Sequence, residues 1–434
     1  MGKEVSQKRA LFLPGYFGNG FGHVGRCLAL ADEMKKENWK VGMVLAGRYC
    51  KLVKENGYDL FSPIFPKRPS TKFSDQNTPA FTYIKDGSGQ VLRDGLTSLW
   101  KIKAAVAELM LIVKKFRPNV LIGDISLLTW ILGKKVNLPV VQIIRSIMYP
   151  GRSKIIWWQD PPQGMESPNI AAVFNPLLEK WKISAIKSVD YLLQGDLYLV
   201  PSIPELEPLP DNVINTHYVG AMVYKQKFKN NLPEPLLNDN QKQKVYITMG
   251  GGAGGVGNLK FFEIIHKAFS QTPWTTIVST GKNFNPKDIP ELSKNIYYSQ
   301  WVPGPEVIKR SDLVIFPGGY GTMMETIKFG VPSIIVPFHS EQESNGRRIA
   351  ENNAGCLLSS AEKSDRDTLI PYKCKYGKFV GCIRKEFNLK PHVLNDSAEN
   401  ILKNCEYKKA AMRLSSLVNK FNREKAVELI KKMV

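Results

Sequence analysis

The chain is poor in cysteine and contains no apolar run long enough to span a bilayer. Its 434 residues include 6 cysteines, at positions 27, 50, 356, 374, 382 and 405, and none of them forms a C-x-x-C pair. This spacing argues against a zinc site or a thioredoxin-like motif, and so few cysteines fit a reducing compartment. The N-terminal ALFLP is broken too soon by glycine and asparagine to be a signal peptide. We therefore expect a cytoplasmic protein.

Acidic residues are fewer than basic ones. The 60 Lys and Arg against 39 Asp and Glu leave a formal net charge of +21. Such a field attracts phosphates, nucleic acids and anionic membrane surfaces. The charge is scattered along the chain, so it selects no partner, and a solvated basic surface explains it equally well. Peripheral contact with the inner face of an anionic membrane stays open, whereas nucleic acid is not an expected partner because no motif supports it.

Apolar runs of strand length alternate with amphipathic segments of helix length. The strand-like runs are 10–14, 41–46, 119–124, 139–144 and 197–202 in the first half, and 245–250, 275–280, 296–301, 313–318 and 333–338 in the second. Near-continuous apolar strands indicate parallel sheets that are covered by helices on both faces. The alternation predicts an α/β protein with two Rossmann-like doubly wound domains that face each other across a cleft.

A segment rich in proline, asparagine and lysine separates the two halves. We predict an N-terminal Rossmann-like domain over 1–225, a linker over 226–243 and a C-terminal Rossmann-like domain over 244–410. Residues 411–434 are predicted to form helices that pack back towards the N-terminal domain. Residues 360–390 look irregular and basic, and their pattern indicates no role.

A glycine cluster in VYITMGGGAGGVGN follows the first strand of the second half and precedes a helix. Glycine can adopt positive φ and let the backbone approach an anion, and the helix adds the positive end of its dipole. The lysine and hydroxyl of a P-loop are absent, which argues against hydrolysis of ATP or GTP. We interpret Gly250, Gly251 and Gly252 as a phosphate-binding loop, with a flexible tight turn as the alternative.

A second turn between strand and helix lies in FPGGYGTMMET. Gly318, Gly319 and Gly321 suit the approach of a phosphate, and Thr322, which is expected to begin the helix, can donate to the same anion. Glu325 follows one turn later, where a carboxylate can accept two adjacent ribose hydroxyls. Thr-Met-Met-Glu is also the pattern of a capping box, in which the two side chains serve the helix itself.

Two further elements flank this turn. Trp301 and its neighbour Val302 are expected at the end of a strand, where a ring or a backbone group can meet a flat base. Glu341 and Gln342 are expected to start another helix at a strand end, which is a natural place to bind sugar hydroxyls. Arg347 and Arg348, further along that helix, are interpreted as a solvated face.

Together these elements resemble the GT-B glycosyltransferases, specifically the UDP-glycosyltransferases of plants and bacteria and their peptidoglycan N-acetylglucosaminyl relatives. FPGGYGTMMETIKFGVPSIIVPFHSEQESN is similar to the family turn for diphosphate and ribose, followed by the P-x-x-x-[DE]-Q element for the donor sugar. The resemblance implies that the residues named above bind a nucleotide-diphosphate sugar, expected to be UDP-linked, and that no other cofactor and no metal is needed. Pro317 stands where the family has a phosphate-contacting histidine, so the 250–255 loop is the expected substitute.

His23 lies in the turn after the first strand, in GYFGNGFGHVGRC. Neutral imidazole at this position can take a proton from an acceptor hydroxyl, and Asp124, at the end of VLIGD, can fix its tautomer. The same family carries this histidine, and RPNVLIGD resembles the strand that supplies its aspartate. The resemblance implies an inverting hexosyltransferase. The alternatives are a helix-start histidine bound to a carbonyl and an aspartate that caps a helix.

Acceptor recognition in this fold falls to loops of the N-terminal domain, here 61–100 and 145–190. Their aromatic residues fit a small molecule, a lipid or a glycan, and they include Trp100, Trp157, Trp158 and Trp181. Three other functions remain open, of which a UDP-sugar epimerase is the most distant. GHVGRC also resembles the nucleotide-sugar hydrolases of pseudaminic acid synthesis, in which His23 would activate water. A basic nucleic-acid or membrane-binding protein without catalysis is the third reading.

Overall fold

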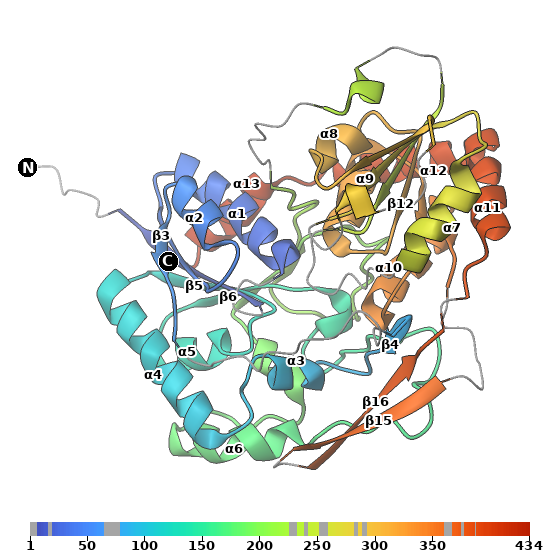
Figure 1. The fold of residues 1–434 in the computed structure, drawn as a ribbon. Coiled ribbons are helices and arrows are strands. Elements are labelled where there is room, and N and C mark those ends of the chain that lie inside the picture. Colours follow the sequence, from blue (N-terminus) through green and yellow to red (C-terminus); the bar gives the residue numbers. More distant parts are fainter. Residues whose placement is uncertain are drawn as a thin grey trace, which may run out of the picture.

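The structure is a computed structural model that describes residues 7–15, 20–64, 79–224, 232–237, 242–250, 259–281, 285–288, 293–359, 367–374, 377–386 and 388–434. Two parallel sheets, each with helices on both faces, form its two halves (Figure 1). The prediction of an α/β protein with two doubly wound units is confirmed. Within the described ranges, no helix is both long enough and apolar enough to cross a bilayer.

The first sheet belongs to the N-terminal half and is parallel throughout. Its spatial order is β3-β2-β1-β5-β6-β7-β8. The order reverses between β1 and β5, whose register sets Pro14 opposite Asp124. Open α/β sheets bind their ligands at such a switch point, outside the carboxyl ends of the strands. The strands are β1 (Arg9–Pro14), β2 (Lys40–Val44), β3 (Asp59–Phe61), β5 (Val120–Asp124), β6 (Val140–Ile143), β7 (Leu197–Val200) and β8 (Thr216–Tyr218).

The second sheet repeats this plan in the C-terminal half. Its order is β11-β10-β9-β12-β13-β14, and the switch point lies between β9 and β12. One glycine turn predicted from the sequence follows β9 and the other follows β12. Because these strands are parallel neighbours, both turns start at the same edge of the sheet. The strands are β9 (Lys244–Thr248), β10 (Thr275–Ser279), β11 (Ile296–Ser299), β12 (Leu313–Phe316), β13 (Ser333–Ile335) and β14 (Gly355–Leu357).

Helices cover both faces of each sheet because the strands bury side chains on both faces. On β1, Leu11 and Leu13 enter one core, whereas Ala10 and Phe12 enter the other. The first half contains α1 (Phe21–Lys36), α2 (Cys50–Glu55), α3 (Ser88–Arg93), α4 (Leu99–Phe116), α5 (Thr129–Val136) and α6 (Ile170–Lys180). The second half contains α7 (Leu259–Phe269), α8 (Gly304–Ile308), α9 (Tyr320–Phe329), α10 (Ser340–Glu351) and α11 (Pro391–Lys403).

The last two helices contact different halves. The helix α12 (Cys405–Val418) packs on α9, and α13 (Arg423–Lys431) packs on α1. An ion pair of 3.1 Å joins Arg423 Nη2 of α13 to Glu33 Oε1 of α1. The end of the chain therefore returns to the N-terminal half (Figure 1).

The expectation of an irregular segment over 360–390 is wrong for much of its length, because residues 367–384 contain a β-hairpin. The hairpin strands pair with each other, and one of them also pairs antiparallel with a short strand from the N-terminal half. The three strands are β15 (Asp367–Cys374), β16 (Gly377–Arg384) and β4 (Phe81–Tyr83). The small sheet thus contains strands from both halves (Figure 1).

The hairpin is held by backbone bonds and a small core. Val380 exchanges two backbone hydrogen bonds with Glu166 of the first half, at 3.1 and 2.9 Å. Phe81 and Cys382 have no exposed surface. The core between hairpin and first half contains Phe81, Tyr83, Ile156, Met165 and Cys382. Apolar burial of this kind stabilises the contact between the halves.

Phe81→Ala should lower the free energy of unfolding by about 3 kcal/mol, because it removes a fully buried aromatic side chain and leaves a cavity. Hydrogen exchange should accelerate in 377–384 and 81–83. Trp100→Ala is the matched control: it removes an aromatic ring that is 60% exposed on α4 and should change stability by less than about 0.5 kcal/mol. Unchanged exchange in the hairpin of Phe81→Ala would show that the hairpin does not depend on this core.

Candidate active site

His23 and Asp124 lie together at the switch point of the first sheet. Asp124 is the last residue of β5 and has no exposed surface, and His23 lies in the first turn of α1. The distance from His23 Nδ1 to Asp124 Oδ1 is 2.7 Å. An ionised carboxylate only accepts hydrogen bonds, so Nδ1 donates and Nε2 is the nitrogen left to take a proton.

The backbone around this pair is shaped to allow the contact. A Cβ at Gly15, just after β1, would lie 2.8 Å from the carbonyl oxygen of Asp124 and 3.2 Å from His23 Nδ1. Glycine is therefore required there. Ile125, directly after Asp124, has φ of 50°, a conformation that costs a residue other than glycine about 1–3 kcal/mol. Strain at such a position is typical of functional sites.

Arg26, which the sequence analysis missed, completes the cluster. Its Nε lies 2.7 Å from Asp124 Oδ2, and its Nη2 lies 2.6 Å from Asp124 Oδ1 and 3.1 Å from His23 Nδ1. Burial raises the pKa of Asp124, but Arg26 and His23 outweigh burial and hold that pKa below its ordinary value. The carboxylate is therefore ionised although it is buried. The signal in the sequence was an arginine three residues after His23, in a helical run that is otherwise free of lysine, arginine and acidic residues up to Ala31.

The turn after β12 leaves open space in front of its backbone. A Cβ at Gly319 or Gly321 would meet nothing within 4 Å. Gly319 is the N-cap of α9, and no side chain caps this helix. The first-turn N–H groups are therefore left for solvent or for an anion. Gly318 has φ of 96°, and a Cβ there would lie 2.6 Å from the carbonyl oxygen of Gln342, so the turn passes close to α10.

The capping-box alternative for Thr322 and Glu325 is wrong. The helix α9 begins at Tyr320, two residues before the predicted start, so Thr322 lies inside the first turn rather than at the N-cap. Glu325 is half-buried, and its carboxylate forms no hydrogen bond or ion pair with any residue in the described part of the chain. Burial raises the pKa of Glu325 to about 7, against the opposing effect of Lys328. A half-buried carboxyl group in this state suits ligand hydroxyls.

The structure describes only part of the predicted glycine loop, but all of the segment predicted to contact the base. Gly250 follows β9 with φ of 74° and open space in front of it, whereas Gly251 and Gly252 lie outside the described residues. Trp301 lies two residues beyond the end of β11 instead of at its end. Its side chain is 37% exposed and Val302 is buried. A partly exposed ring can stack on a base. The Val302 side chain is buried, so only its backbone N–H and C=O groups could contact a base.

Glu341 and Gln342 lie in the first turn of α10. Glu341 Oε1 is 2.9 Å from Arg145 Nη1 of the first half, and the glutamate side chain is 40% exposed. Burial raises the pKa of Glu341, but Arg145, His339 and His23 hold it below its ordinary value. His23 and the predicted sugar element are therefore within electrostatic reach. The Gln342 amide oxygen accepts from the Phe338 N–H at 2.8 Å, which gives it a structural role as well.

Arg145 links the two halves beneath α10. Its guanidinium is buried and donates to Glu207 Oε1 at 2.7 Å and to Asn345 Oδ1 at 2.5 Å, besides Glu341. Its guanidinium carbon also lies 4.1 Å from the ring centroid of Tyr320, the first residue of α9. The role of Arg145 could not be predicted from the sequence, because its partners are more than sixty positions away in the chain.

The expectation that Arg347 and Arg348 form a solvated face is wrong. Their guanidinium carbons lie 4.9 and 3.7 Å from the ring centroids of Trp158 and Trp157, which belong to the first half. Trp157 Nε1 donates to Ser344 Oγ at 2.7 Å. Segment 145–158 therefore contacts α10 along its length, from the predicted sugar element onward.

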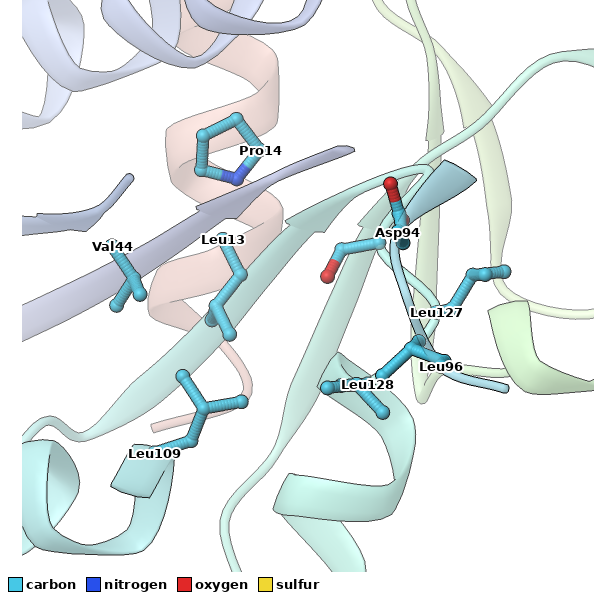
Figure 2. Close-up of a pocket in the computed structure, with 9 residues that line it drawn as sticks. Leu13, Pro14, Val44, Asp94, Leu96, Leu109, Leu127 and Leu128 are labelled. Atoms are coloured by element: carbon cyan, nitrogen blue, oxygen red, sulfur yellow. The ribbon is translucent and has the colours of Figure 1, made fainter. Parts of the chain in front are cut away.

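A small pocket lies at the carboxyl ends of β1 and β2, beside α4 (Figure 2). Its volume is about 10 Å³, which has room for about one water molecule. The carboxylate of Asp94 is its one charged group; the lining is Leu13, Pro14, Val44, Asp94, Leu96, Leu109, Ser126, Leu127 and Leu128. Leu13 and His23 lie on opposite faces of the first sheet. Leu13 packs with α4 on one face, and α1, the helix that carries His23, covers the other face.

Comparisons with known proteins agree with this geometry. Residues 254–370 match the family model described as the glycosyltransferase family 28 C-terminal domain. The NDP-glycosyltransferase YjiC of Bacillus subtilis is 23% identical over 350 residues, which cover 79% of this chain and 83% of that relative. The calicheamicin glycosyltransferase CalG4 superposes with a TM-score of 0.71 at 17% identity, over 99% of this chain and 98% of that one.

The spinosyn rhamnosyltransferase SpnG, solved with thymidine diphosphate, superposes with a TM-score of 0.66 at 16% identity, over 98% of this chain and 100% of that one. The family model spans the turn after β12 and the helix α10, and the solved structures span both sheets. The resemblance inferred from the sequence is confirmed, and the chain is a glycosyltransferase with the GT-B fold.

Proposed function

We propose that the chain moves a sugar from a nucleoside diphosphate donor to an acceptor hydroxyl in a single displacement that inverts the anomeric carbon. The supporting observation is the 2.7 Å contact between His23 Nδ1 and Asp124 at the switch point of the first sheet. Glu341 of the second half lies within electrostatic reach of this histidine. The pair is therefore close to the element that would hold the donor sugar.

His23 is the general base in this proposal. Its Nε2 takes the proton of the acceptor hydroxyl while the acceptor oxygen bonds to the anomeric carbon. The bond from that carbon to the diphosphate oxygen breaks, and the diphosphate leaves with the electron pair. Asp124 holds Nδ1–H and offsets the charge of the imidazolium that forms. Attack and departure take place on opposite faces of the carbon, so its configuration inverts.

The donor diphosphate is held mainly by backbone amides. The open turn at Gly319 and Gly321, the N-terminus of α9 and the Thr322 hydroxyl surround one side of it. The Gly250 turn supplies the other side. Pro317 has no imidazole to offer the phosphate, so these amides take over that contact.

Glu325 and Trp301 bind the nucleoside. Two ionised carboxylate oxygens of Glu325 suit two adjacent ribose hydroxyls, whereas the thymidine diphosphate found with SpnG offers one. This difference favours a ribonucleoside diphosphate donor, and UDP is the one that the family resemblance implies. Glu341 and Gln342 then contact the sugar, with Glu341 kept ionised by Arg145.

The acceptor binds to the first half. The pocket of Figure 2 is lined mainly by leucine, but its volume of about 10 Å³ has room for only about one water molecule, so it does not hold the acceptor. The acceptor hydroxyl itself must reach His23 at the end of β1.

His23→Ala should lower kcat by about 10²–10⁴-fold, because the general base is lost. Asp124→Asn should also lower kcat, because the tautomer of His23 is no longer fixed. The donor is chosen by thermal stabilisation from a panel of UDP- and TDP-sugars, and transfer to phenolic, lipid and glycan acceptors is followed by mass spectrometry. His392→Ala is the control: this histidine is exposed on α11 and should leave kcat unchanged.

A wild-type transfer rate in His23→Ala would contradict the proposed base. Release of the nucleoside diphosphate at one rate with or without acceptor would instead support hydrolysis, with His23 activating water.

Donor affinity should depend on the ionisation of Glu325. Burial raises the pKa of this carboxyl to about 7, so below that pH it is protonated in the unliganded protein. Ribose hydroxyls donate to the ionised form, so affinity for a UDP-sugar should fall as pH drops below about 7, by up to about tenfold per pH unit. The diphosphate diester of a UDP-sugar does not titrate in this range. Glu325→Gln should bind the donor weakly at every pH, without this slope, in isothermal titration calorimetry.

The same substitution should stabilise the unliganded protein at pH 8. A carboxyl whose pKa is raised on folding destabilises the fold above that pKa, so Glu325→Gln removes a cost and should raise Tm at this pH. Glu306→Gln is the control. Glu306 lies on α8 in an exposed ion pair with Arg310, so its substitution should change neither the Tm nor the pH slope of donor affinity. An unchanged pH slope of donor affinity in Glu325→Gln would remove Glu325 from the donor site.

A further inference from the structure

We propose that Arg26 is a positioning residue of the transfer reaction, which fixes Asp124 and keeps His23 in the neutral form that can accept a proton. The inference rests on the proposed role of His23 as the base. It adds a buried cation to a pair that the sequence presents as a histidine and a carboxylate alone.

The geometry makes Arg26 part of the pair. It lies on α1 one turn after His23, so both side chains reach the end of β5. Its Nε and Nη2 bind the two oxygens of Asp124 at 2.7 and 2.6 Å, and both residues are buried. This bidentate contact uses the planar fork of the guanidinium, which a lysine cannot reproduce. Arg26 therefore sets the direction in which Asp124 faces His23.

The guanidinium also lies against the imidazole. Arg26 Nη2 is 3.1 Å from His23 Nδ1. Protonation of His23 would place a second cation in this contact, and a nearby like charge disfavours the charged form of a group. Arg26 thus opposes the protonation that Asp124 favours. The same repulsion helps His23 to release its proton after each turnover.

Two other titratable groups around Arg26 are neutral. Cys27 is its neighbour on α1, and burial raises the pKa of this thiol well above its ordinary value. Tyr320 of α9 has its ring centroid 5.5 Å from the Arg26 guanidinium carbon, and burial raises the pKa of its phenol. Neither group carries charge near neutral pH, so neither offsets Arg26.

The remaining charges pair with one another across the halves. Glu341 of α10 is ionised and lies 2.9 Å from Arg145, which also binds Glu207. This second cluster contains two acidic side chains and one guanidinium, so it adds no net positive charge near His23. Arg26 is the guanidinium in direct contact with His23, so its loss would favour a proton on the imidazole.

The test is the pH dependence of kcat/KM for Arg26→Met and Arg26→Lys. Arg26→Met should move the acid limb of the profile upward by about 1–2 pH units, so that activity lost at neutral pH returns at higher pH. Arg26→Lys keeps the charge but loses the fork, so its acid limb should stay in place while kcat falls. Arg423→Met is the matched control: this arginine pairs with Glu33 of the same helix α1 at 3.1 Å, away from Asp124, and its loss should change neither value.

A second readout does not require catalysis. In protein labelled at its 5 histidines, NMR follows the titration of His23, assigned by comparison with His23→Gln. Its midpoint should rise in Arg26→Met by the same amount as the acid limb. If Arg26→Met does not fold, Arg26→Lys still tests the bidentate contact: an unchanged kcat in this variant would overturn the positioning role.

The outcomes separate this inference from the proposed function. A uniform loss of activity in Arg26→Met, with unchanged acid limb and NMR midpoint, would mean that Arg26 only supports the fold, and would overturn the inference. A raised midpoint together with a fully active His23→Ala would keep the electrostatic role of Arg26 but remove His23 as the base.

Discussion

Asp124 carries a charge at the end of β5, where it has no solvent exposure. An isolated buried carboxylate costs several kcal/mol, and that cost is offset only by partners with good geometry. Arg26 and His23 are those partners, and both come from the first two turns of α1. The pairing of β1 with β5 and the absence of a side chain at Gly15 bring α1 to this position. The reactive end of the first half thus depends on one buried ionic contact.

The second half is tied to this centre through α10. Its first turn carries Glu341, whose partner Arg145 comes from the first half, and its later turns stack on Trp157 and Trp158. Any movement of one half against the other would therefore change the surroundings of Glu341. Direct contacts therefore join the first turn of α10, which is predicted to bind the sugar, to segment 145–158, which belongs to a region predicted to bind the acceptor. Donor and acceptor binding should accordingly affect each other.

The sequence was sufficient for the two sheets and for several site positions, because each parallel strand is a short apolar run and each turn follows its strand directly. The order of those strands brought His23 and Asp124 together. Arg26 and Arg145 were missed because their acceptors lie far away in the chain. The 367–384 hairpin was missed because its partner strand β4 has only three residues and lies far away in the chain, and because Pro371, Gly377 and Gly381 interrupt its own strands. The domain limits and the roles of the site residues stay predictions.

The stereochemistry of the product tests the central claim most directly. With a matched donor and acceptor, proton NMR of the first transferred product gives the configuration of its anomeric carbon through the coupling between the protons on C1 and C2. A single displacement assisted by His23 predicts a configuration opposite to that of the donor, because the acceptor attacks from the face away from the diphosphate. A product that retains the donor configuration would contradict a single displacement and the role assigned to the buried cluster.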